Sequence, residues 1–215
     1  MHDKYWKLIV ADKTAYFENV LSLIKDIELK QNKEYDELQA KYKAENPQPD
    51  ESGYSWQDHL GDIGHEYQET VQILHKSFVV SIIMFMESKL LELCSHLQEE
   101  FKHLFSVYDL KHTGITRSIN YLKILGIYFP KNAETKEDFN LAFRIRNNLV
   151  HADGKINDEK QKIEILGNNA NIVNKISFFN DELTFTESYL KDLIVLNQKI
   201  CDEISDDWIG KDFPS

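Results

Sequence analysis

The sequence predicts a mainly α-helical bundle with a small β-hairpin before its last helix. Two long stretches repeat apolar residues every three or four positions, which is the period of a helix that buries one side. Later in the chain, two short strand-like runs flank Asn180-Asp181, a pair that suits a tight turn. At 215 residues, the chain is long enough for one core, so a single domain is the default.

The first half of the chain predicts two long helices. Residues 14–45 carry Phe17, Leu21, Ile24 and Ile27 at helical spacing, and two prolines and a glycine in 46–53 then break the helix. The second helix is expected over 65–104. Its segment 78–86 is apolar on every side, which predicts either burial all round or burial shared with a partner.

The second half predicts shorter elements. Helices are expected over 115–127 and 134–152, the latter stopped by Gly154, and a last amphipathic helix over 187–204. Strand-like patterns occupy 162–166, 175–179 and 183–186. The expected organisation is an N-terminal helical segment 1–45 packed on the same domain, a loop 46–60, and a helical domain 61–215.

The formal charge of −11 argues against a surface that coats nucleic acid throughout. Residues 109–151, however, hold seven basic groups against four acidic ones, a net charge of +3. This basic region predicts a polyanionic ligand, and ordinary charge fluctuation explains it equally well.

Cys94 and Cys201 lie in apolar helical surroundings, which favours buried thiols in a reducing compartment over a disulfide. Charges interrupt the apolar residues of the N-terminus, so no signal peptide is expected. The apolar run 78–86 is far shorter than the ~18–20 residues that span a bilayer. We therefore expect a cytoplasmic protein without membrane association.

Arginine is scarce, since only Arg117, Arg144 and Arg146 occur among 25 basic residues. Two of them stand shortly before His151 in the stretch FRIRNNLVHADG, residues 143–154. Arginine binds phosphate or carboxylate oxygens in pairs through a rigid, always charged fork, which lysine cannot reproduce.

A helical wheel places polar side chains of this stretch on one face. With Leu141 at zero and about 100° per residue, Arg144 lies near 300°, Asn147 near 240°, Asn148 near 340° and His151 near 280°. Arg146 lies about 140° from His151 and reaches this face only through its long side chain. A cationic fork and an imidazole suit phosphodiester chemistry, whereas pairing with surface carboxylates and a helix-capping histidine is the simpler alternative.

The run RNNLVH, from Arg146 to His151, resembles the Arg-x(4–6)-His signature of the HEPN superfamily, in which a polar residue such as Asn147 follows the arginine. Glu87, inside the apolar run IIMFMESKLLELC, resembles a glutamate of an earlier helix in several prokaryotic subfamilies. The resemblance covers roughly residues 65–205 and implies a HEPN-like helical bundle with a small β-hairpin before the C-terminal helix.

The resemblance implies a metal-independent endoribonuclease that needs no cofactor and cleaves RNA by attack of the 2′-hydroxyl on its own phosphate. His151 would act as general base or acid, Arg146 would stabilise the transition state, and Asn147 would orient the substrate or the histidine. Arg144 and Asn148 would support the site, and Glu87 would orient an arginine. Asp153 departs from those members that carry a modifiable tyrosine two residues after the histidine.

Members of the superfamily place two copies of the motif across a homodimer interface, so a composite site is expected. The implied setting is a toxin–antitoxin or phage-defence system, with an antitoxin or other defence protein as partner. The alternative is a non-catalytic HEPN-like module that binds RNA or nucleotides or acts as a scaffold. A structural helical protein with an accidental motif is a third reading.

Overall fold

The protein is mainly helical, with one antiparallel hairpin before the final helix. The computed structural model describes residues 2–45, 56–101, 105–112, 114–166, 172 and 174–208. The elements in chain order are α1 (His2–Glu45), α2 (Trp56–Phe101), the 3₁₀ turn η1 (Val107–Asp109), α3 (Gly114–Ile124), α4 (Ala133–Ala152), α5 (Glu159–Leu166), β1 (Ile176–Phe179), β2 (Glu182–Phe185) and α6 (Glu187–Trp208).

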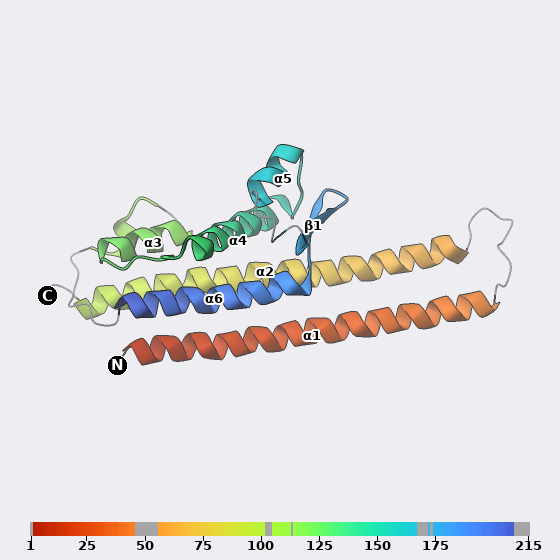
Figure 1. Ribbon diagram of the computed structural model, residues 1–215, viewed down its shortest axis with the longest axis horizontal. Helices are drawn as coiled ribbons and strands as arrows, with labels where there is room; N and C mark the ends of the chain where they lie inside the picture. The colour runs from red at the N-terminus through yellow and green to blue at the C-terminus, as the bar shows by residue number, and fades with distance from the viewer. Residues whose placement is uncertain are drawn as a thin grey trace.

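The helices are arranged around α2, the longest of the elements described (Figure 1). Helices α1 and α2 run antiparallel, and α6 lies beside the C-terminal half of α2 and contacts both. Helices α3, α4 and α5 and the hairpin lie on the opposite side of α2 and α6 from α1 (Figure 1). The core therefore lies on two sides of α2.

Helix α1 begins at His2, earlier than the predicted Thr14, and ends at the predicted Glu45. Phe17 is buried and contacts Phe78 and Phe85 of α2 edge-on. Ile27 was predicted to belong to the buried side, but it is 41% exposed. The reason is that α6 begins opposite Lys25, where Lys25 pairs with Glu187, so α1 continues beyond that point without α6 against it.

Helix α2 begins at Trp56, so the last five residues of the predicted loop 46–60 are helical, and residues 46–55 lie outside those described. For 78–86, the alternative of burial all round within the chain is wrong, and the alternative of burial shared with a partner stays a prediction. Phe78, Val79, Ile82, Ile83 and Met86 are buried, but Met84 is 51% exposed. The neighbouring helices cover two sides of α2 and leave a strip that includes Met84 uncovered.

Helices α3 and α4 end at residues with a left-handed backbone. Gly126, at φ 79°, follows α3, which is shorter than the predicted 115–127. Helix α4 begins where the Asn132 side chain accepts a hydrogen bond from the Glu134 N–H at 2.9 Å. It ends at Asp153, which adopts φ 55°, followed by Gly154 at φ 79°. The predicted helix 134–152 is thus present.

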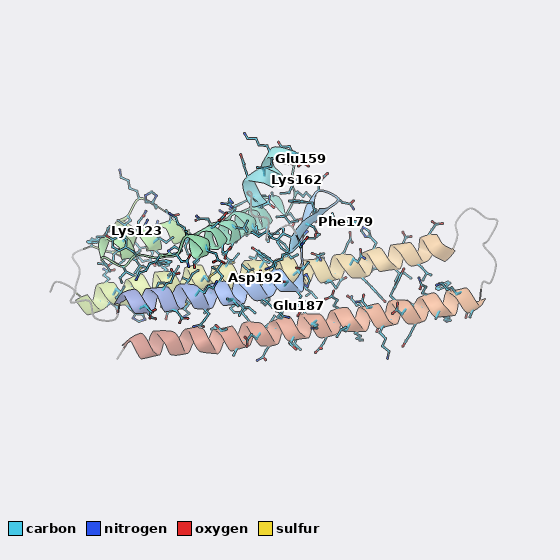
Figure 2. The ribbon with its side chains drawn as sticks, viewed as in Figure 1. Lys123, Glu159, Lys162, Phe179, Glu187 and Asp192 are labelled. Atoms are coloured by element: carbon cyan, nitrogen blue, oxygen red, sulfur yellow. The ribbon has the colours of Figure 1, made fainter. Side chains whose placement is uncertain are left out.

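The predicted strand 162–166 is wrong, because this segment forms α5. The side chain of Asp158 accepts a hydrogen bond from the Gln161 N–H at 2.8 Å, as a helix-capping residue does. Lys160 and Glu164 then pair along the helix at 4.0 Å. Figure 2 labels Glu159 and Lys162 on this helix, and the Lys162 ammonium lies over the Phe178 ring of the hairpin.

The hairpin holds the segment after α4 in place. Its turn is formed by Asn180 and Asp181, both with positive φ, as the sequence predicts. The Asp181 carbonyl accepts a hydrogen bond from the Ile156 N–H, and the Leu183 N–H donates to the Gly154 carbonyl. Strand β2 is itself attached to α2, because the Nδ1 of His75 lies 2.8 Å from the Phe185 carbonyl oxygen. The end of α4 is therefore fixed by the hairpin and α2 together.

Both cysteines are free and buried. Burial raises the pKa of each thiol to about 12, which makes both groups unreactive near neutral pH. Among the helices described, none combines the length and apolar character that crossing a bilayer requires.

Candidate functional site

The C-terminal half of α4 carries the residues singled out by the sequence, and it lies against α2 in the antiparallel direction. Arg146 is opposite Glu87, and Gly154, just after the end of α4, is opposite Lys76. A Cβ atom on Gly154 would lie 3.5 Å from the end of the Lys76 side chain, so this lysine reaches the turn that follows α4. The site is thus built on two packed helices, with the end of α4 held by the hairpin.

Arg146 forms an ion pair with Glu87. Its Nη2 lies 3.7 Å from the Glu87 Oε2, and its Nη1 donates a hydrogen bond to the Asn147 Oδ1 at 3.1 Å. The two side chains of the ion pair are 21% and 27% exposed, so both are largely enclosed. The Arg146 Nε is buried and has no hydrogen-bond partner among the residues described. The fork is therefore oriented, but not all of its donors are used.

Glu87 also contacts the start of α3. A Cβ atom on Gly114 would lie 2.7 Å from the Glu87 Oε1, and Gly114 has φ 57°. A side chain at position 114 would thus collide with the carboxylate and would also force an unfavourable backbone. The first turn of a helix stabilises a nearby negative charge, and so does a guanidinium, so α3 and Arg146 both favour the ionised Glu87 carboxylate. Glu87 is therefore held between α3 and Arg146, a contact with α3 that sequence reasoning did not identify.

Arg144, which the helical wheel favoured as the partner of His151, is engaged elsewhere. Its Nε and Nη2 each lie 3.4 Å from the Ile165 carbonyl oxygen in the last turn of α5. A guanidinium stabilises the unpaired carbonyls at the end of a helix. Arg144 therefore joins α4 to α5, while Arg146 joins α4 to α2.

Arg117, the third arginine, is also part of a local structure. It donates to the His112 carbonyl and lies over the Tyr108 ring, at 5.7 Å from the ring centroid. These contacts connect the first turn of α3 with η1. Among the side chains that the structure describes, Arg146 is the arginine whose guanidinium faces a carboxylate of the central helix.

His151 lies in the last turn of α4 and is exposed. Among the residues described, its imidazole forms no hydrogen bond and no ion pair. Asn147, also exposed, lies one helical turn before it and contacts Arg146. The arginine, the asparagine and the histidine thus follow one another along the end of α4.

Asn148 was placed on the polar face by the helical wheel, but it is buried. Its side-chain Nδ2 donates to the Lys155 carbonyl at 2.9 Å. The backbone carbonyl of Asn148 accepts hydrogen bonds from the N–H groups of Asp153 and Gly154. Its position on the wheel, near 340°, is at the border of the apolar face, which explains the burial. In the structure Asn148 fixes the turn that ends α4.

Asp153 belongs to this turn and also lines a groove of about 1150 Å³ between α1, α2 and the hairpin. Its left-handed backbone is that of a turn residue before Gly154. Within the described ranges, no group of three metal-ligating side chains is present. The groups that the site presents are the guanidinium of Arg146, the carboxylate of Glu87, the amide of Asn147 and the imidazole of His151.

No protein-family model, curated protein or solved structure matches this chain.

Proposed function

We propose that this protein is a HEPN-type, metal-independent endoribonuclease whose site is formed by Arg146, Asn147 and His151. The observation that carries the proposal is the ion pair between Arg146 and Glu87, which orients a guanidinium on the same helix end as an exposed histidine. Arg144 is bound to the end of α5, so the proposal assigns the phosphate-binding role to Arg146 alone.

In the proposed reaction, the 2′-hydroxyl oxygen of the RNA bonds to the adjacent phosphorus and the bond from phosphorus to the 5′ oxygen breaks. The products are a 2′,3′-cyclic phosphate and a 5′-hydroxyl. His151 accepts the proton of the 2′-hydroxyl or donates one to the leaving 5′ oxygen. Arg146 neutralises the charge that develops on the non-bridging phosphate oxygens, and Asn147 orients the histidine or the substrate.

The proposed site is composite. Arg146 and His151 leave α4 in directions about 140° apart, so one copy presents them to different sides of the helix end. We propose a homodimer in which the two α4 helices lie close together. The arginine and histidine of one copy then lie close to the arginine and histidine of the other copy. The setting that we propose is a cytoplasmic toxin–antitoxin or phage-defence system, with an antitoxin as a further partner.

A second candidate is a non-catalytic module of the same fold that binds RNA or nucleotides. The charge of −11 and the internal pairing of Arg146 favour it, because both weaken the attraction of an RNA backbone. The two candidates differ in whether the RNA is cut.

The test is incubation of the purified chain with end-labelled RNA in EDTA, followed by analysis of the product ends. We expect 2′,3′-cyclic phosphate ends, and a loss of about 100-fold or more in His151→Ala and in Arg146→Lys. The matched control is His96→Ala, which removes another exposed histidine, on α2. RNA that is bound and left intact would favour the module, and cleavage undiminished in His151→Ala would overturn the proposed site.

A further inference from the structure

The segment that contains α3 and the loops on either side of it carries an excess of positive charge. Residues 110–133 contain no Asp or Glu, and no other run of the chain is free of acids over such a length. They contain four basic residues, a net charge of +4 in a chain of net charge −11, namely Lys111, Arg117, Lys123 and Lys131. Asp109, just before this run, accepts a hydrogen bond from the Ser106 N–H and caps η1. The segment is therefore a basic region on an acidic molecule, which attracts a polyanion.

Two lysines of this region have no carboxylate partner. Lys111 and Lys123 are exposed, and among the residues described neither side chain has an ion pair or a hydrogen bond. By contrast, Lys191 of α6 pairs with Glu187 at 2.6 Å. A cation without a partner can neutralise an RNA phosphate without first losing an ion pair.

Tyr108 indicates the kind of polyanion, because it places an aromatic ring at the surface next to a cation. It is 61% exposed, and the Arg117 guanidinium lies 5.7 Å from the centroid of its ring. The Arg117 Nε donates to the His112 carbonyl, and its two Nη atoms have no partner among the residues described. An exposed ring beside a cation is the arrangement on which proteins stack an unpaired base.

The exposed side of α3 extends this surface. Arg117 and Lys123 lie about 120° apart on a helical wheel, with Asn120 between them. Tyr121 and Leu122 are buried and attach the opposite side of the helix to the core. Lys123, which Figure 2 labels on α3, lies about 9 Å beyond Arg117 along the helix. A strand that follows α3 can therefore contact both cations.

The surface also adjoins the site proposed for RNA cleavage. A Cβ atom on Gly114, the first residue of α3, would lie 2.7 Å from the Glu87 Oε1. The Glu87 Oε2 in turn lies 3.7 Å from the Arg146 Nη2. Arg117 belongs to the first turn of the same helix as Gly114. RNA bound along α3 can thus extend past Glu87 to Arg146.

We propose that η1 and α3 form an RNA-binding surface outside the Arg-x-x-x-x-His motif, with one base stacked on Tyr108 and phosphates near Arg117, Lys111 and Lys123. This inference rests on the proposed function, because it states how the RNA is held next to the bond that is cut. An acidic protein would use the lysines of the surface but would not need the tyrosine ring.

The first test measures binding of a labelled, unpaired RNA of about 12 nucleotides by fluorescence anisotropy in EDTA. Every substitution is made in a His151→Ala chain, so that the RNA stays intact. We expect Tyr108→Ala to weaken binding about tenfold, because one stacked base is lost. On a strand of abasic nucleotides, which keeps the phosphates, the same substitution should have no effect. Tyr16→Ala on α1 is the matched control and should bind normally, because Tyr16 is 56% exposed and the Lys13 ammonium lies 5.2 Å from its ring centroid.

The second test measures the salt dependence of the same binding. Lys111→Gln combined with Lys123→Gln should reduce the slope of log K against log salt by about 1.4, since each phosphate contact of a single strand contributes about 0.7. Lys41→Gln combined with Lys43→Gln removes the same charge from exposed positions on α1 and should leave the slope unchanged. All these lysines are exposed, so the circular dichroism spectra should match.

Three results would overturn the proposal. The first is equal binding of RNA by Tyr108→Ala and Tyr16→Ala, and the second is an equal slope in the two double lysine variants. Either of these would leave an acidic protein as the ligand of the surface. The third is the absence of binding at about 1 mM, a concentration that detects even weak complexes.

Cleavage by the wild-type chain separates this proposal from the proposed function. A wild type that cuts RNA, with Tyr108→Ala binding as Tyr16→Ala does, would overturn the surface and leave the endoribonuclease intact. Binding that depends on Tyr108 and on the two lysines, with RNA left uncut by the wild type, would overturn the endoribonuclease and retain the surface.

Discussion

Glu87 is the residue on which three elements converge. It lies on α2, pairs with Arg146 of α4, and leaves no room for a side chain at Gly114, the first residue of α3. A largely enclosed carboxylate is costly unless a cation or a hydrogen-bond donor faces it. The same contact that orients the guanidinium thus also fixes where α3 begins.

We predict that Gly114→Ala destabilises the fold by about 2 kcal/mol, because the left-handed backbone and the collision with Glu87 both oppose a Cβ atom. In a Glu87→Ala background the collision is absent, and the same substitution should cost only about 1 kcal/mol. Chemical denaturation of the four proteins of this double-mutant cycle gives both values. Equal costs in the two backgrounds would show that Glu87 does not occupy the space beside Gly114.

At the scale of elements, the hairpin depends on its attachment to α2. Lys76 of α2 lies 2.6 Å from Glu182 of β2, next to the turn that carries Asp153 and Gly154. The hydrogen bond from Lys76, and then its charge, lower the pKa of Glu182 below its ordinary value. A carboxylate with a lowered pKa stabilises the fold above its ordinary pKa, and this contribution is lost as the pH falls below it.

We therefore predict that Lys76→Met, which keeps the apolar stem of the side chain, lowers stability by about 1 kcal/mol at pH 7. The difference from wild type should shrink as the pH falls below the ordinary glutamate value of 4.5. Thermal unfolding at several pH values measures it. In a Glu182→Gln background, the effect of Lys76→Met on stability should not depend on pH. With Glu182 present, a loss of stability of equal size at pH 7 and pH 3 would contradict the assignment.

The long helices and the hairpin were predictable because their signals are local. Periodic apolar residues predict α1, α2, α4 and α6, and Asn180-Asp181 predicts the turn. Segment 162–166 was assigned wrongly because Ile163 and Ile165 alternate as in a strand. The capping contact of Asp158 and the pairing of Lys160 with Glu164 stabilise a helix instead.

The candidate site was predictable only in part. A contact between Glu87 and an arginine of the later helix was expected, and the structure contains it. The choice between the arginines was open, because the helical wheel favoured Arg144 and the motif favoured Arg146. The sequence does not predict that the backbone carbonyl of Ile165 binds Arg144, because this contact forms only when α5 packs on α4.

At the scale of the whole molecule, the exposed strip of α2 has a place in the proposed dimer. Met84 is exposed and precedes Glu87 by three residues, so both lie on the same side of α2. An exposed methionine less than one helical turn from Glu87 suits the homodimer interface that we propose.

We predict that the wild-type chain has a mass in solution of twice its 25.2 kDa, and that Met84→Lys is monomeric with an unchanged circular dichroism spectrum. Leu23→Lys, on the exposed side of α1, is the matched control and should remain dimeric. Light scattering coupled to size-exclusion chromatography measures the masses. A wild-type monomer that cleaves RNA would contradict the composite site.

The central claim is that Arg146, held by Glu87, acts on the RNA phosphate while Arg144 only fastens α5. Its most direct measurement compares RNA cleavage by Arg146→Lys and Arg144→Lys under identical conditions. Both variants keep the charge and lose the fork. We predict a loss of about 100-fold or more in Arg146→Lys, with Arg144→Lys within about threefold of wild type and slightly less stable. A silent Arg146→Lys together with an inactive, folded Arg144→Lys would contradict the account.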